Sequence, residues 1–287
     1  MRKTRLLISL SLLSAFTGLL HLTGQTSGDR YFFLQMSDPQ FGMYTKNRDF
    51  SQETANYEFA IATANRLKPR FVIVCGDLVN KPGDAAQIAE YTRITSNLNP
   101  SIHVYHVAGN HDVGNEPTAA SIEAWRRRFG PDYYSFREGP LYGIVLNSSL
   151  IHSPGNAPEL LERQNEWLTA ELAKAQASGA KHIVVFQHHP FFLERGDEPD
   201  QYFNIPLVRR TPLLRSFKEA GIKHLFAGHY HRNAHGWDGE IEMVTTGPVG
   251  MPLGGARSGF RIVWIGDEIR HQYFEFGALP NQAPETP

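Results

Sequence analysis

The chain has 287 residues, of which 41% are hydrophobic and 20% charged, the composition of a soluble globular protein with enough apolar material for a real core. Its formal net charge of −1 argues against a protein that binds nucleic acid or another polyanion through bulk charge. The single cysteine, Cys75, lies in the apolar run FVIVC and cannot form an internal disulfide, so packing must stabilise the fold.

The N-terminus predicts an export signal. Three basic residues among the first five precede the apolar run LLISLSLLSAFTGLLHL, and no acidic residue occurs before Asp29. We therefore assign residues 1–24 to a signal peptide and expect a periplasmic or secreted protein that has no membrane association once the signal is removed. The alternative is an uncleaved anchor formed by residues 6–22, because that run is only a little short of spanning a bilayer.

Strand-like and helix-like runs alternate through the first half of the chain. Apolar runs bounded by turn residues predict strands, and apolar residues at helical spacing predict helices. In chain order, we predict a strand at 31–37, a helix at 53–68, a strand at 71–77, a helix at 86–98, a strand at 103–109 and a helix at 121–130. Paired strands should follow at 133–149, joined across Glu138, Gly139 and Pro140.

The second half continues the alternation and then changes. A long amphipathic helix is predicted at 159–178, followed by a strand at 182–190, a helix at 212–221 and a strand at 224–231. Three last strands at 240–247, 259–266 and 269–276 have no helix between them, which predicts an antiparallel meander. We expect one α/β domain with two sheets over residues 30–276, and a disordered tail at 277–287.

Polar, metal-capable side chains follow five of the predicted strands. Taken alone, a Gly-Asp pair is typical of a turn, Gly-Asn-His-Asp of a turn that leads into a helix cap, and two histidines before a proline of a loop. In α/β sheets, however, ligands collect at the carboxyl ends of strands. The five strand ends carry Asp38 with Gln40, Asp77, Asn110 with His111 and Asp112, His188 with His189, and His229 with His231.

Carboxylates, amides and imidazoles at one sheet edge suggest hydrolysis at two metal ions. Oxygen and nitrogen ligands suit Mn, Fe, Zn or Mg. One carboxylate that bridges two ions would let them activate a shared water as hydroxide and hold phosphoryl oxygens. Glycine precedes Asp77, Asn110 and His229, and it permits a close approach of the backbone at each of these turns.

The order of these motifs resembles the calcineurin-like metallophosphoesterase family, in which D-x-H, G-D, G-N-H-D, H and G-H-x-H occur in sequence. The resemblance covers residues 31 to about 275, and it is closest to the branch of calcineurin-like phosphoesterase domain-containing protein 1, through DPQFG, CGDL, VFQH and GHYHRNA. It implies a four-layer fold in which two facing mixed β-sheets are flanked by helices.

The resemblance also implies roles for individual residues. Asp77 would bridge two divalent ions, and His111 would be the catalytic general acid, binding the phosphate together with Asn110. His189 would have a structural role behind the ligands. The first metal site would contain Asp38, Gln40 and His231, and the second would contain Asn110, His188 and His229.

Two positions depart from the broad family pattern. Gln40 stands where the family has a histidine, so the first ion would bind more loosely or favour Mn or Mg. Asn80 stands where many relatives carry an acid that orients the catalytic histidine, which leaves the partner of His111 open.

We therefore expect a monomeric dinuclear metallophosphoesterase that acts on phosphomonoesters, either a phosphorylated small molecule or phosphoserine and phosphothreonine in a protein. The alternatives are a phosphodiesterase or nucleotidase that uses the same site, and an inactive metal-binding scaffold, which Gln40 and Asn80 suggest.

Overall fold

The computed structural model describes residues 30–282. The expected signal peptide and the alternative anchor at 6–22 lie outside these residues. Within residues 30–282, no helix has both the length and the apolar character needed to cross a membrane.

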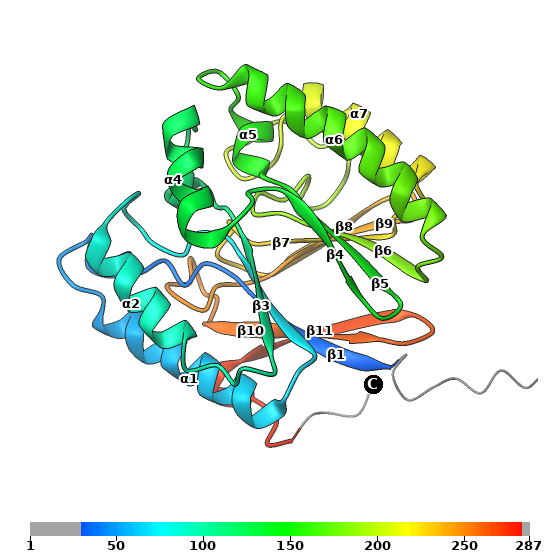
Figure 1. Cartoon of the computed structure of the whole chain (residues 1–287). Coiled ribbons are helices and arrows are strands. Elements are labelled where there is room, and N and C mark those ends of the chain that lie inside the picture. The colour runs from blue at the N-terminus through cyan, green and yellow to red at the C-terminus, as the bar shows by residue number, and fades with distance from the viewer. Residues whose placement is uncertain (1–29, 283–287) are drawn as a thin grey trace, which may run out of the picture.

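Two mixed β-sheets face each other, and helices cover their outer surfaces (Figure 1). The five-stranded sheet has the order β11-β10-β1-β2-β3. Its strands are β1 (Tyr31–Met36), β2 (Phe71–Cys75), β3 (His103–Val107), β10 (Gly259–Ile265) and β11 (Ile269–Glu275). β1 pairs in parallel with β2, and β2 with β3, whereas β10 is antiparallel to both β1 and β11.

The six-stranded sheet has the order β4-β5-β6-β7-β9-β8. Its strands are β4 (Tyr134–Glu138), β5 (Leu141–Val145), β6 (His182–Phe186), β7 (His224–Ala227), β8 (Ala234–Asp238) and β9 (Ile241–Thr245). β5, β6, β7 and β9 run parallel, and β4 and β8 are antiparallel edge strands. The predicted hairpin across Gly139 is therefore present.

Three apolar layers hold this arrangement together. α1 (Ser51–Leu67) and α2 (Ala85–Thr95) pack on the five-stranded sheet, and α6 (Pro158–Ala177) and α7 (Leu207–Glu219) pack on the other. Between the sheets, the ring of Phe33 lies 4.5 Å from that of Phe71 in its own sheet, and 5.8 Å and 6.1 Å from those of Phe186 and Phe226 in the facing sheet. The four-layer α/β fold expected from the family resemblance is thus confirmed.

The remaining helices are short or lie at the ends of the sheets. They are α3 (Asn110–Val113), α4 (Ala119–Phe129), α5 (Ser148–His152) and the 3₁₀ helix η1 (Phe276–Ala278).

The predicted C-terminal meander of three strands is wrong. β9 lies in the six-stranded sheet beside β7, and only β10 and β11 form an antiparallel pair in the other sheet. β9 instead forms a hairpin with β8, a strand that the sequence analysis did not identify. The Asp238-Gly239 dipeptide between them is a strong hairpin signal that could have located it.

The start of the expected disordered tail is folded against α1. η1 follows β11 directly, and the ring of Phe276 lies 5.3 Å from that of Phe59. Arg66 donates hydrogen bonds to the carbonyl oxygens of Pro280 (2.8 Å) and Asn281 (2.6 Å). Residues 277–282 therefore have a defined place, and the rest of that tail lies outside the described residues.

Candidate metal centre

The loops that follow β1, β2, β6 and β7 are tied to one another at the edge where these strands end. Asp38 N–H donates to Gly76 O at 3.1 Å, and Gly228 N–H donates to His188 O at 3.0 Å. Two further bonds cross between the sheets, because His188 Nδ1 donates to the carbonyl oxygen of Cys75 at 2.9 Å and His229 N–H donates to Asp38 Oδ2 at 3.0 Å. The facing sheets thus bring their polar strand ends into one buried cluster.

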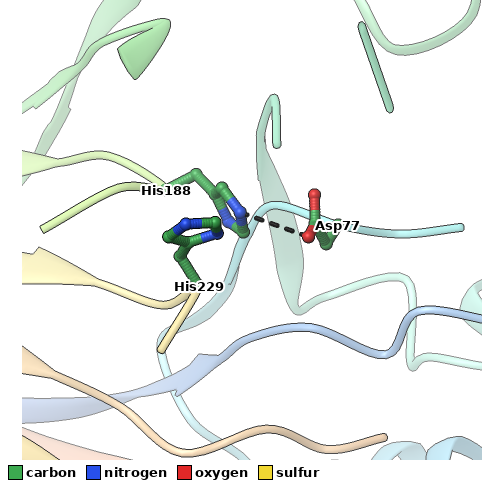
Figure 2. Close-up of side chains that lie close together, drawn as sticks. All are labelled: Asp77, His188 and His229. Carbon is green, nitrogen blue, oxygen red and sulfur yellow. Dashed lines mark ion pairs between the residues drawn. The ribbon is translucent and has the colours of Figure 1, made fainter. Parts of the chain in front are cut away.

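Two sets of metal-capable side chains lie in this cluster. In each set, the ligand atoms all lie within 4.8 Å of one another. Asp77, His188 and His229 form one set, and Asp38, Asp77 and His231 form the other. Figure 2 shows the first set, in which the imidazoles of His188 and His229 lie side by side and His188 Nε2 approaches Asp77 Oδ2, at 3.3 Å. Asp77 is the residue that the two sets share.

The turns that present these side chains have an unusual backbone. Eight non-glycine residues in the described chain have positive φ, and five of them are Asp38, Gln40, Asp77, His229 and His231. Such conformations cost free energy and persist where the surrounding structure enforces them, commonly at functional sites. The local strain therefore concentrates at the residues that the sequence assigned to metal binding.

The glycines before three of these residues leave room for the loops to meet. A Cβ atom at Gly76 would lie 2.4 Å from His188 Nδ1, one at Gly109 would lie 2.2 Å from Asp77 N, and one at Gly228 would lie 1.6 Å from Ser37 Oγ. No side chain fits at these distances.

Backbone carbonyl groups fix two of the imidazole rings. The carbonyl oxygen of Cys75 accepts a hydrogen bond from Nδ1 of His188, and that of Met251 accepts one from Nδ1 of His231 at 2.6 Å. Each ring therefore presents Nε2 to the cluster, as metal-binding histidines do when their other nitrogen is held from behind. His231 Nε2 lies 3.4 Å from Asp38 Oδ1.

Charges in the cluster balance one another. Burial opposes ionisation of His188, yet the carboxylate of Asp77 outweighs it and raises the pKa of His188 to about 9. Burial likewise opposes ionisation of Asp77, but His188 and His111 hold its pKa well below the usual range. Burial lowers the pKa of His229 to about 3, so this imidazole is neutral and can offer a nitrogen lone pair to a metal ion.

Asn110, the first residue of α3, joins the Asp77–His188–His229 set. Its Oδ1 lies 2.9 Å from His188 Nε2. Its Nδ2 donates to Asn115 Oδ1 at 2.7 Å, which leaves the amide oxygen facing the histidine.

The donor atoms fit divalent metal ions. His229 Nε2 and Gln40 Oε1 are buried and have no hydrogen-bond partner among the described residues. Unpartnered buried polar atoms are costly, and a metal ion beside each of these atoms would satisfy it. Two carboxylates, three imidazoles and two amide oxygens are the kinds of ligand that Mn, Fe and Zn bind in hydrolases.

His111 lies on α3 next to the shared carboxylate. Its backbone N–H donates to Asp77 Oδ1 at 2.8 Å, and its ring Nδ1 lies 2.7 Å from the carbonyl oxygen of Asn80. A carbonyl can only accept, so Nδ1 carries a proton and Nε2 is the nitrogen left to exchange one. The backbone of Asn80, rather than a carboxylate, thus orients this ring.

His189 lies behind the cluster and belongs to neither set. Ser148 Oγ lies 3.1 Å from its Nδ1, and its ring stacks on that of His152 with centroids 4.8 Å apart. Burial, and then the neighbouring His229, hold its pKa well below the usual value for histidine. Ser148 also accepts the backbone N–H of His188 at 3.1 Å, a contact that the sequence gave no means of finding.

Aromatic residues form part of the wall beside His229. The rings of Tyr202 and Phe203 lie 5.2 Å and 5.6 Å from its imidazole, and Tyr202 is 57% exposed. The next residue, Asn204, is fully buried and donates to Glu198 Oε1 at 2.7 Å, so its side chain stabilises the loop that carries Tyr202 and Phe203.

The fold and the cluster define a metal-dependent hydrolase, and the comparison with known proteins gives its family. The family model described as "Calcineurin-like phosphoesterase" matches residues 33–233, and the chain belongs to this family. Serine/threonine-protein phosphatase CPPED1 of Homo sapiens is 36% identical over 272 residues, which span 89% of this chain and 87% of that protein. Within the family, the chain lies in the CPPED1 branch, and it is a phosphoesterase.

Solved structures show the same fold at low sequence identity. A dimetal phosphatase from Danio rerio superposes with a TM-score of 0.65 at 14% identity, over 86% of this chain and 96% of that one. The purple acid phosphatase PPD1 of yellow lupin gives a TM-score of 0.65 at 13% identity, over 86% of this chain and 52% of that one.

Proposed function

We propose that this protein is a dinuclear metal-dependent phosphatase that hydrolyses phosphomonoesters, with phosphoserine and phosphothreonine in proteins as its first substrate class. The observation that carries the proposal is the position of Asp77, the one residue shared by the two donor sets. The phosphoprotein class is suggested by the relative named as a serine/threonine-protein phosphatase.

The proposed ligands divide between the two sets. Asp38, Gln40 and His231 would hold one ion, Asn110, His188 and His229 the other, and Asp77 both. When bound, two divalent ions lower the pKa of water and neutralise charge on phosphoryl oxygens.

The chain itself supplies orientation and a proton. The backbone N–H of His111 donates to Asp77, and its ring Nδ1 donates to the carbonyl oxygen of Asn80. These two hydrogen bonds give Nε2 a fixed position from which to protonate a leaving oxygen. The exposed ring of Tyr202 lies 5.2 Å from the imidazole of His229, beside the proposed second site.

A substrate panel tests the proposal. Metal-free protein is loaded with Mn, Fe, Zn or Mg and assayed with p-nitrophenyl phosphate, with phosphoserine and phosphothreonine peptides, and with phosphodiesters. Metal-dependent hydrolysis of the monoesters supports the proposal. Faster turnover of diesters or nucleotides would identify the phosphodiesterase alternative. Metal binding without hydrolysis of any ester would identify a scaffold.

A further inference from the structure

A row of four amide side chains leads from α2 to the candidate metal centre. Gln87 on α2 donates from Nε2 to Asn47 Oδ1 at 2.9 Å, and Asn80 donates from Nδ2 to the same oxygen at 2.8 Å. Gln40 in turn donates from Nε2 to Asn80 Oδ1 at 3.2 Å. These hydrogen bonds form one continuous row that ends at Gln40.

The direction of every bond in the row is fixed at its far end. Gln87 Oε1 accepts the backbone N–H groups of Asn80 (3.1 Å) and Lys81 (3.0 Å). A backbone N–H can only donate, so the atom of Gln87 that faces these groups must be its oxygen. Its nitrogen must then face Asn47, so the atom of Asn47 that accepts this hydrogen bond is its oxygen.

The same logic carries through to Gln40. Asn80 must direct its nitrogen to the oxygen of Asn47, which leaves its own oxygen facing Gln40. Gln40 can satisfy that oxygen only with its Nε2. Its Oε1 is therefore the free atom, and this atom is buried and has no partner in the part of the chain that the structure describes.

We propose that Gln87, Asn47 and Asn80 are positioning residues that fix the amide of Gln40 so that its oxygen, and not its nitrogen, is presented to the first metal ion. This inference rests on the proposed function for the presence of that ion. An amide can coordinate a cation through oxygen but not through its NH₂ group, so a reversed amide would remove the ligand. The row supplies the orientation that a histidine would obtain from a single hydrogen bond.

The local backbone is built around the row. A Cβ atom at Gly42 would lie 2.6 Å from Gln87 Nε2 and 2.9 Å from Asn47 Oδ1, so glycine leaves the space that their hydrogen bond occupies. Asp84 caps α2 by accepting the N–H of Gln87 at 3.2 Å, which fixes the start of the helix that carries this residue.

The row also meets the catalytic histidine at Asn80. The carbonyl oxygen of Asn80 accepts from His111 Nδ1, while its side chain contacts Gln40 and Asn47. A side-chain substitution at Asn80 leaves the carbonyl in place, so effects on the Gln40 ligand can be separated from effects on His111.

The substitution Gln87→Glu tests the direction of the row. A carboxylate still accepts both backbone N–H groups but cannot donate to Asn47. We expect the affinity of the first Mn²⁺ site to fall about 10-fold or more, the usual effect of changing a group that supports a ligand, and the second site to be unchanged. Free Mn²⁺ is followed by electron paramagnetic resonance during titration of metal-free protein, so no turnover is needed. The added negative charge of the glutamate would by itself raise Mn²⁺ affinity. A fall in Mn²⁺ affinity therefore cannot be caused by that charge.

Asn65→Asp is the matched control. Asn65 on α1 accepts the N–H of Asn99 at 2.7 Å and donates to the carbonyl oxygen of Asn97 at 2.8 Å, with no contact to the row. It introduces the same charge into a comparable amide bridge, and it should leave both Mn²⁺ affinities unchanged. Asn80→Ala is a second variant in a half-buried position, and it should reproduce the loss seen with Gln87→Glu.

A double-mutant cycle decides whether the row acts through Gln40. In a Gln40→Ala background, Gln87→Glu should have no further effect on Mn²⁺ binding. An equal loss in that background, or wild-type affinity in both Gln87→Glu and Asn80→Ala, overturns the inference while the proposed function stands. A wild-type protein that binds no divalent ion overturns the proposed function and the inference with it.

Discussion

The backbone N–H of His111 donates a 2.8 Å hydrogen bond to Oδ1 of Asp77, the carboxylate shared by both candidate metal sites. The other oxygen of that carboxylate, Oδ2, lies 3.3 Å from His188 Nε2. One side chain thus connects the proposed bridging position, the proposed general acid and the second site.

Asp77→Asn should abolish hydrolysis and release both metal ions. The substitution keeps the size of the side chain and one oxygen, but it removes the negative charge that two cations would share. Metal content measured after gel filtration, together with p-nitrophenyl phosphate hydrolysis, checks the prediction. A variant that retained two ions and more than a few percent of activity would place the bridge elsewhere.

His111→Ala should leave metal content intact and lower kcat by about 10²–10⁴, the usual worth of a positioned general acid. The loss should shrink for esters with good leaving groups, because these need less protonation. Comparison of p-nitrophenyl phosphate with an alkyl phosphate measures this difference. Equal losses on both esters would indicate that His111 binds phosphate and donates no proton.

His188→Ala and His189→Ala should differ in kind. His188 offers Nε2 to the Asp77–His188–His229 set, so its loss should remove the second ion. His189 pairs with Ser148 and stacks on His152, so its loss should lower the melting temperature and keep both ions. Breaking that buried hydrogen bond should cost about 1–3 kcal/mol. Metal stoichiometry and thermal unfolding of both variants check this, and the reverse pattern would exchange the two roles.

The strand ends were readable from the sequence because their chemistry is local. Asp38, Asp77 and His229 each follow an apolar strand within a few residues, and the carboxyl ends of parallel strands meet at one sheet edge. Their partners were not readable. The carbonyl oxygen of Met251, which holds His231, comes from the Gly-rich stretch 247–259, and no residue pattern in that stretch indicates the contact.

The prediction of a three-stranded meander at the C-terminus was wrong because it, too, depended on long-range contacts. β9 is an apolar run like β10, and its place beside β7 depends on a long-range pairing between Phe226 and Val244. Local periodicity predicts that a strand exists but not which sheet it joins. The side chain of Asn80 stands where many relatives carry an acid, but it is the backbone carbonyl of Asn80 that contacts His111, and side-chain identity does not predict a backbone contact.

Metal binding should release a proton and should tighten as pH rises. In the metal-free protein, burial disfavours protonated His188, but Asp77 outweighs burial and raises its pKa from 6.5 to about 9. Below pH 6.5 this pairing contributes fully to stability, and the contribution is lost as pH rises through about 9. Because a metal ligand must be neutral at Nε2, the ion displaces this proton.

Apparent affinity at the second site should therefore rise by about tenfold per pH unit between about pH 7 and 9, and then level off. Calorimetric titrations at about pH 7.5, in buffers of different ionisation enthalpy, count the protons released. One proton per second ion is expected from His188 in the wild type. Metal binding without proton release at that pH would mean that His188 is already neutral in the free protein.

Gln40→His should tighten the first ion and shift its preference towards Zn or Fe. An amide oxygen is a weaker and harder donor than an imidazole nitrogen, so wild-type activity should depend on added Mn or Mg. Gln40 lies close to the cluster, because its backbone N–H donates to the carbonyl oxygen of Asp77 at 2.9 Å, and the residue is only 1% exposed. Its buried Oε1 has no partner among residues 30–282, and in the variant an imidazole nitrogen would take the place of this oxygen as the donor atom. Titration of each metal into metal-free wild type and metal-free Gln40→His gives both affinities directly. Equal affinities with an unchanged order of metals would show that Gln40 does not coordinate, and that Asp38, Asp77 and His231 are the protein ligands of this ion.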